Sequence, residues 1–287
     1  MSRIAYVNGR YLPQDQAGVN IEDRGFQFAD AVYEYFAVFD RRLADAKGHF
    51  DRLDRSLSEL SMPQPMSRPA LRMVIGQLLR LNRITDGAVY LQVSRGVAKR
   101  DHPFPDPAPL PTLVLTTKPV DFTALDAKAA KGVSVITHAD NRWGRCDIKT
   151  VGLLPNAMAK TRAKAAGAEE AWLVDDLGLV TEGASTNAWI LDASGTLRTR
   201  DTQANILHGI TRATLIEHLK EQGIPFSEKP FTVEEAKQAK EAFLTAASAF
   251  VLPIVKIDEV IIGNGRPGPL SLRLRALYMD TARRSAT

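Results

Sequence analysis

The stretch from which the fold of this chain can be inferred is Arg142-Trp-Gly-Arg-Cys-Asp-Ile-Lys149-Thr-Val151. On local context alone, a lysine between an isoleucine and a threonine is an ordinary solvated residue at a strand edge. Two later segments change that interpretation: Leu179-Val-Thr-Glu182-Gly-Ala-Ser-Thr-Asn187 and Gly209-Ile-Thr-Arg212. Because the three segments follow one another in the chain, Lys149 has to be interpreted together with them.

Together these segments contain the groups that pyridoxal phosphate requires. A lysine that is neutral often enough can bond an aldehyde, and a carboxylate can keep the pyridine nitrogen protonated. The unpaired amides at a helix start can bind the phosphate. Lys149, Glu182 and the helix predicted to begin at Ile210 and Thr211 are the candidates for these roles. Taken alone, Glu182 would be interpreted as a carboxylate in a turn.

Further hydroxyl and charged groups are candidates for the phosphate. Arg52 lies in a helix predicted from the apolar spacing of residues 49–60, where an exposed helix charge is the alternative. Thr245 and Ser248 interrupt an apolar run, and such hydroxyls either bond the backbone or line a site.

A third group consists of Tyr33, Arg100 and His102. An arginine holds a carboxylate through paired hydrogen bonds, as the α-carboxylate of an amino acid would require. An ordinary surface loop at residues 100–102 is the alternative.

The composition excludes several classes of protein. The chain has 287 residues, 45% hydrophobic and 24% charged, with a net charge of +4 and no basic run, so it favours a soluble globular protein that binds no nucleic acid. A single cysteine, Cys146, excludes an internal disulfide, and five scattered histidines show no metal-ligand spacing. No apolar run is long enough to span a membrane, which predicts a cytoplasmic location.

The pattern along the chain mixes hairpin strands with crossover helices. This predicts an α+β (mixed α/β) fold in two domains, residues 1–120 and 121–287, with a linker at Lys118-Pro-Val-Asp121. Strands are expected at residues 4–12 (a hairpin), 32–38, 89–93, 132–138 and 255–262, and helices at 67–81, 154–166, 209–221, 233–240 and 269–283. The segment Gly263-Asn-Gly-Arg-Pro-Gly268 matches a dinucleotide motif, but too little chain follows it for a βαβ unit, so a turn is predicted.

Five motifs in the same order resemble the fold-type IV pyridoxal phosphate enzymes, the class-IV aminotransferases, and within them the D-amino-acid transaminases. The motifs are Glu22–Glu34, Gln92–Gly96 followed by Arg100–Pro105, Arg142–Lys149, the Glu182 segment and Gly209–Arg212. The resemblance covers nearly the whole chain. It implies a small N-terminal α/β domain and a larger, cofactor-binding C-terminal pseudo-barrel domain.

The resemblance also implies residue roles. Lys149 would form the internal aldimine and move the proton, and Glu182 would pair with the pyridine nitrogen. The phosphate would be held by Arg52, Ile210, Thr211 and Ser248. Tyr33, Arg100 and His102 would bind the substrate carboxylate, with the last two acting across a homodimer that shares its active sites. The chain departs from the commoner family pattern at Thr150, Val151, Pro155 and Ala246-Ala247.

The expected activity is therefore ping-pong transamination of a D-amino acid such as D-alanine or D-glutamate, with a 2-oxo acid such as 2-oxoglutarate or pyruvate as acceptor. Rivals with the same fold are a branched-chain L-amino-acid transaminase, an (R)-amine transaminase and 4-amino-4-deoxychorismate lyase. A non-enzymatic protein that binds pyridoxal phosphate or another small ligand is the rival from another class.

Overall fold

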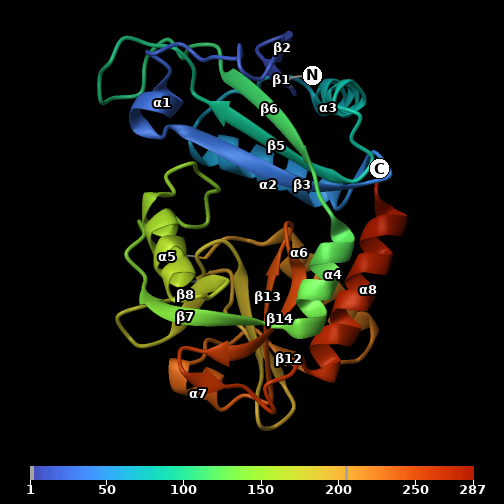
Figure 1. The fold of residues 1–287 in the computed structure, drawn as a ribbon. Coiled ribbons are helices and arrows are strands. Elements are labelled where there is room, and N and C mark those ends of the chain that lie inside the picture. The colour runs from blue at the N-terminus through green and yellow to red at the C-terminus, as the bar shows by residue number, and fades with distance from the viewer. Residues whose placement is uncertain (1–2, 204–205) are drawn as a thin grey trace. The chain divides into compact units, whose positions relative to one another are not determined.

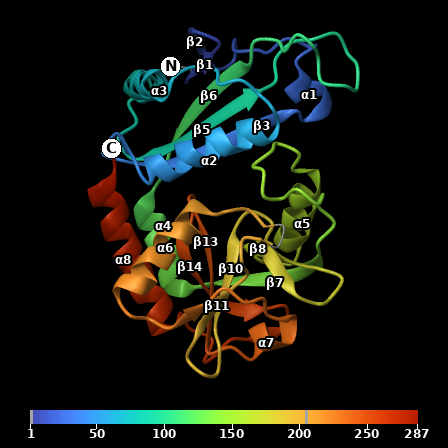
Figure 2. The ribbon, with the colours of Figure 1, turned by 180° about the vertical axis from the view of Figure 1, so that it is seen from behind.

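The computed structural model describes residues 3–203 and 206–287, which divide into two compact units. The first unit runs to Asp121 and also takes in Ile148–Gly152 and Ser285–Thr287. The second comprises Phe122–Asp147 and the described part of Leu153–Arg284. Figures 1 and 2 show the elements of each unit from opposite sides. A short piece of chain containing Lys149 thus leaves the second unit and belongs to the first.

The first unit is built on a six-stranded antiparallel sheet with strand order β2-β1-β6-β5-β3-β4. Helices α2 and α3 supply apolar side chains to its core, including Leu53, Leu57, Leu71 and Ile75. The bounds are β1 Ile4–Val7, β2 Arg10–Pro13, α1 Arg24–Phe28, β3 Ala31–Phe39, β4 Arg42–Leu43, α2 Ala46–Glu59, α3 Arg68–Leu81, β5 Gly87–Ser94 and β6 Thr112–Pro119.

Local sequence explains where these elements begin and turn. Asn8 and Gly9 both have positive φ, 44° and 90°, as a tight hairpin turn demands, so β1 and β2 pair as the sequence predicts. Ser67 caps α3 by accepting a hydrogen bond from the Ala70 amide, and a proline occupies the first turn. Both predicted elements are confirmed.

The second unit holds a nine-stranded sheet of mixed parallel and antiparallel pairs, ordered β12-β11-β10-β13-β14-β7-β8-β9, with β15 paired to β14. Its helices are α4 Phe122–Lys131, α5 Leu154–Ala165, α6 Ile210–Glu221, α7 Val233–Lys237 and α8 Pro269–Ser285. Its strands are β7 Val133–Ala139, β8 Glu170–Val174, β9 Val180–Gly183, β10 Asn187–Leu191, β11 Leu197–Thr199, β12 Phe226–Ser227, β13 Glu241–Ala246, β14 Phe250–Ile257 and β15 Val260–Ile261. The predicted mixed α+β class is confirmed.

Three local predictions need correction. Lys118 and Pro119 of the expected linker are the last residues of β6, so only Val120 and Asp121 connect β6 to α4, a helix that was not predicted. The single strand expected at 255–262 is divided, because Asp258 adopts a positive φ of 50° and reverses the chain between β14 and β15. Helix α7 ends at Lys237 rather than at Lys240.

Two further features agree with the sequence. Residues 263–268 form a turn, since Gly263 and Gly265 have φ of 57° and 75°, which L side chains rarely adopt. No helix in the described part of the chain is both long enough and apolar enough to cross a bilayer.

Candidate active site

Lys149 is fixed by its backbone alongside β3 of the first unit. Its carbonyl accepts a hydrogen bond from the Tyr33 amide at 3.0 Å, and Thr150 forms an isolated bridge with Val32. The neighbouring Ile148 is buried in the core of the same unit. The lysine is therefore attached to a rigid strand although its own segment has no regular structure.

The Lys149 amine lies over an aromatic ring. Its Nζ is 4.2 Å from the centroid of the Tyr33 ring, and no described residue forms a salt bridge or hydrogen bond with this Nζ. The Tyr33 ring in turn lies 5.5 Å from the ring of Tyr90 on the paired strand β5. An ammonium over a ring gains only modest stabilisation. This arrangement suits an amine that must become nucleophilic.

Arg52 is buried in the same unit and is no exposed helix charge. Its Nε and Nη2 donate to the two oxygens of Glu34 at 2.7 and 2.8 Å, and the same carboxylate lies 2.7 Å from His49 Nδ1. Burial alone would raise the pKa of Glu34, but Arg52 and then His49 lower it to about 2. Burial lowers the pKa of His49. The cluster holds the arginine rigidly, although sequence analysis named only Arg52.

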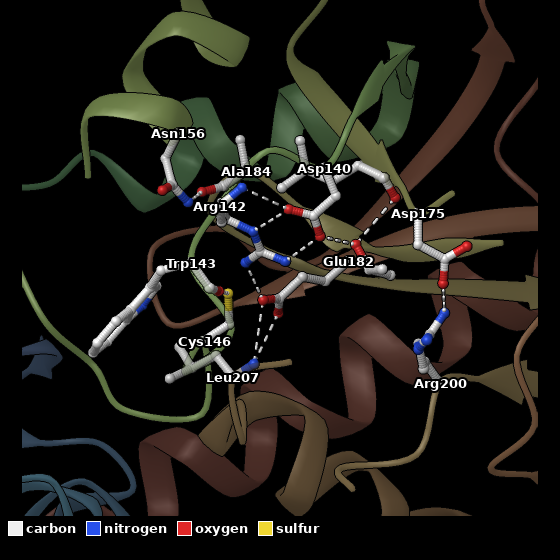
Figure 3. Close-up of polar contacts among 12 residues, drawn as sticks. Asp140, Arg142, Trp143, Cys146, Asn156, Asp175, Glu182, Ala184, Arg200 and Leu207 are labelled. Atoms are coloured by element: carbon white, nitrogen blue, oxygen red, sulfur yellow. Dashed lines mark hydrogen bonds and ion pairs between the residues drawn. The ribbon is translucent and has the colours of Figure 1, made fainter. Parts of the chain in front are cut away.

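Glu182 lies in a dense network of the second unit, shown in Figure 3. Arg142 Nη1 and Asn187 Nδ2 donate to its two oxygens, and the Leu207 amide lies 3.2 and 3.3 Å from them. The side chain is almost completely buried. Burial raises the pKa of Glu182, and Arg142 partly offsets that rise. A buried carboxylate of this kind favours a further positively charged hydrogen-bond donor, such as a protonated ring nitrogen.

The same network reaches the start of α6. Asn187, which donates to Glu182, also donates to the Leu207 carbonyl at 3.1 Å, just before Gly209 caps the helix. A Cβ on Gly209 would lie 1.8 Å from Asn187 Oδ1, so only glycine fits there. The structure thus brings Glu182 together with the predicted phosphate residues Ile210 and Thr211. No side chain caps this helix, and its first amides can bind an anion.

The hydroxyls near this helix have different surroundings. Thr211 is buried, with its Oγ1 3.4 Å from the hydroxyl of Tyr278. Thr245 is buried in β13 and accepts a hydrogen bond from Trp189 Nε1 at 3.1 Å, so it bonds a side chain instead of the backbone. Ser248 is exposed in the turn between β13 and β14.

Arg100 and His102 lie in an exposed loop of the first unit. The Arg100 guanidinium is 5.1 Å from the ring centroid of Phe28, and the His102 ring is 5.7 Å from the same ring. Neither side chain has a hydrogen bond or ion pair with a described residue. Arg24 donates to the carbonyls of Asp101 and His102, which anchors the loop backbone. The two side chains are therefore available to a ligand.

The donor set suits pyridoxal phosphate. An unpaired amine, a buried carboxylate that already gathers donors, and an uncapped helix start are the groups that its aldehyde, ring nitrogen and phosphate need. Within the described residues, no group of three or more His, Cys, Asp or Glu side chains could hold a metal ion. Asn187, Glu34, His49 and Arg142 were not predicted as site residues from the sequence. Each of them has a partner on a different strand, helix or loop, so no local pattern indicates them.

Comparisons with known proteins identify the family of the chain. Residues 31–257 match the model of the family described as amino-transferase class IV. The chain is 38% identical over 271 residues to a D-alanine aminotransferase of Staphylococcus haemolyticus, covering 94% of each, and 38% identical over 274 residues to one of Bacillus licheniformis, covering 96% and 95%. It superposes with a TM-score of 0.90 on a T.th. branched-chain amino acid aminotransferase with pyridoxamine 5'-phosphate, at 27% identity over 99% of this chain and 96% of that one.

Proposed function

The chain belongs to the class IV aminotransferases, and from this premise we propose that it transfers the amino group of a D-amino acid to a 2-oxo acid. Family membership confirms the predicted enzyme class, an aminotransferase that depends on pyridoxal phosphate. The observation that carries the proposal is the Lys149 amine, fixed by the backbone of β3 and lying over Tyr33 with no ion-pair partner among the described residues.

We assign the cofactor contacts as follows. Lys149 would hold the aldehyde covalently, and Glu182 would pair with the ring nitrogen. The amides and hydroxyl at the start of α6, from Ile210 and Thr211, would bind the phosphate, as would Arg52. Ser248 is exposed, and of the proposed phosphate residues it has the least structural support.

Bound pyridoxal phosphate supplies an electron sink for negative charge that develops at the substrate Cα. Lys149 Nζ accepts the Cα proton and later returns it, which is general acid–base catalysis by a positioned amine. Glu182, a buried carboxylate, would keep a proton on the ring nitrogen of the bound cofactor. Arg142 and Asn187 restrict Glu182 to one orientation.

The proposal also names the substrates and the residues that bind them. Arg100 and His102 bind the α-carboxylate together with Tyr33, and the relatives named for D-alanine support a D-amino acid as donor. D-Alanine and D-glutamate are the expected donors, with pyruvate and 2-oxoglutarate as acceptors. A branched-chain L-amino acid is the second candidate, because the T.th. branched-chain enzyme shares the fold, although its identity to this chain is lower.

A homodimer with shared active sites and a cytoplasmic location complete the proposal. The homodimer rests on the family resemblance around residues 100–102. The location rests on the composition and on the single cysteine, which fits a reducing compartment.

The test is a donor panel on the purified holoenzyme without acceptor. D-Alanine and D-glutamate should change the absorbance spectrum of the bound cofactor within one turnover, and pyruvate should restore it. L-Leucine and an (R)-amine should act far more slowly, with free pyridoxal phosphate as the control for uncatalysed reaction. A faster response to L-leucine than to any D-amino acid would replace the proposed substrate, and no response to any amine donor would reject the enzyme.

A further inference from the structure

Arg142 forms a two-sided ion pair within the second unit (Figure 3). On one side, its Nε and Nη2 donate to Oδ1 and Oδ2 of Asp140 at 2.9 and 2.8 Å. On the other side, its Nη1 donates to Glu182 Oε1. One guanidinium therefore joins two carboxylates that are far apart in the sequence.

Asp140 is itself held in place. Its Oδ2 accepts a hydrogen bond from Thr181 Oγ1 at 2.7 Å, and the same hydroxyl oxygen lies 3.1 Å from the Leu173 carbonyl in β8. Because a guanidinium is planar and rigid, the paired bonds to Asp140 fix the direction of the remaining Nη1. Asp140 thus determines where Arg142 places its charge on Glu182.

We propose that Arg142, oriented by Asp140, is the positioning residue that keeps Glu182 ionised and aimed at the cofactor ring nitrogen. The role in catalysis rests on the proposed function, whereas the coupling between Arg142 and Glu182 is a property of the protein alone. Arg142 need not touch substrate or cofactor in this role.

Burial and charge explain why such a residue is needed. The side chains of Arg142, Asp140 and Glu182 are only 8%, 13% and 5% exposed. Burial raises the pKa of Glu182, and Arg142 is the nearby cation that opposes the rise; Asp140 acts in the opposite direction. Cys146, a further titratable neighbour, has a pKa raised to about 11 by burial and so stays neutral at the pH of these experiments. A protonated Glu182 would lose its charge attraction for a ring N–H.

The first experiment uses the cofactor-free protein and a double-mutant cycle. Arg142→Gln should lower Tm by roughly 10 °C near neutral pH, because it leaves Glu182 buried without its cation. Without Arg142 the folded-state pKa of Glu182 rises further above the unfolded value. The loss should therefore grow as pH rises from about 4 to about 8. In the Glu182→Gln background this pH-dependent part should disappear.

The second experiment follows pyridoxal phosphate binding and the pH dependence of the holoenzyme spectrum. Arg142→Gln should weaken cofactor binding at least about tenfold, since a charged hydrogen bond that orients Glu182 is lost. Arg142→Lys keeps the charge but not the fork, so it should recover part of the binding. Asp140→Asn should give an intermediate loss. Arg200→Gln is the matched control, because it removes another arginine–aspartate pair of this unit, 2.8 Å to Asp175.

The outcomes distinguish the coupling between Arg142 and Glu182 from its role in the proposed function. The coupling would be overturned if Arg142→Gln lowered Tm equally, and independently of pH, in the wild-type and Glu182→Gln backgrounds. It would also be overturned if Arg142→Gln bound the cofactor no more weakly than Arg200→Gln does. If Arg142→Gln does not fold, Arg142→Lys and Asp140→Asn carry the same comparison. A coupling found in a protein that transaminates no donor would uphold the ion-pair role and reject the proposed function.

Discussion

Lys149 and Tyr33 are joined twice: the Tyr33 amide donates to the Lys149 carbonyl at 3.0 Å, and the Lys149 Nζ lies 4.2 Å from the Tyr33 ring centroid. The backbone bond fixes the position of the lysine, and the ring contact favours a direction for its amine. Two residues far apart in the sequence therefore form one local structure on the edge of strand β3.

Lys149→Ala should abolish the reaction while leaving the fold intact. The side chain has no ion pair or hydrogen bond with a described residue to lose, but it carries the amine that acts as base, a role worth about 10²- to 10⁴-fold in rate. Turnover of D-alanine is the measurement, with the circular dichroism spectrum and Tm as checks on folding. Tyr33→Phe is the companion variant, because it keeps the ring and should retain the cofactor spectrum. Turnover by Lys149→Ala within a few-fold of wild type would contradict the assignment.

Glu34→Gln should destabilise the protein in a pH-dependent way. The pKa of Glu34 is lowered from 4.5 to about 2 by Arg52 and His49 against the effect of burial. A lowered pKa contributes stability above the unfolded value, about 3 kcal/mol for this shift, and the contribution is lost as pH falls from about 4.5 towards 2. The variant should therefore melt roughly 5–10 °C below wild type at neutral pH, and the difference should shrink on acidification.

Asp54→Asn is the control for that measurement. Asp54 pairs with Arg68, whose side chain is 40% exposed, so screening by solvent leaves little stability in the pair. The control should melt close to wild type at every pH. A Glu34→Gln variant that behaves in the same way would show that the buried cluster contributes no net stability.

The sequence could predict the order of the motifs but not which of them form one unit. Lys149 lies between segments of the second unit, yet the bridge from Thr150 to Val32 attaches it to the first. Apolar spacing correctly placed Arg52 on a helix. Arg52 is buried together with its ion-pair partner Glu34, which lies on strand β3. The apolar spacing of a helix carries no information about a partner on a strand.

Arg142 illustrates the same limit within the second unit. Arg142 belongs to the same segment as Lys149, but the structure pairs its side chain with Asp140 and Glu182. Asp140 is close in sequence, but Glu182 reaches Arg142 only because β9 lies in the same sheet as β7 and β8. The Asn8-Gly9 hairpin and the Ser67 cap could be predicted because the residues that form each of them are neighbours in the sequence.

Thr211→Val should weaken cofactor binding without altering substrate preference. The change keeps the shape of a buried side chain at the start of α6 but removes its hydroxyl, so the phosphate should lose one hydrogen bond, about a tenfold loss in affinity. Titration of the cofactor-free protein with pyridoxal phosphate measures it. Tyr278→Phe removes only the hydroxyl that lies 3.4 Å from Thr211 Oγ1, and it should have a smaller effect. Equal affinities for wild type and Thr211→Val would exclude this hydroxyl as a phosphate ligand.

Arg100→Ala should raise KM for the amino donor with little change in Tm. The side chain is exposed and makes no ion pair with a described residue, only a contact at 5.1 Å with the Phe28 ring, so little stability depends on it. Loss of a charged hydrogen bond to the substrate carboxylate should cost roughly 10- to 100-fold in kcat/KM. Lys99→Ala, an exposed neighbour in the same loop, is the charge-matched control. D-Alanine and an (R)-amine without a carboxylate should be compared for each variant. Because only D-alanine has the carboxylate, an equal loss with both donors would show that Arg100 acts on the loop and not on the substrate.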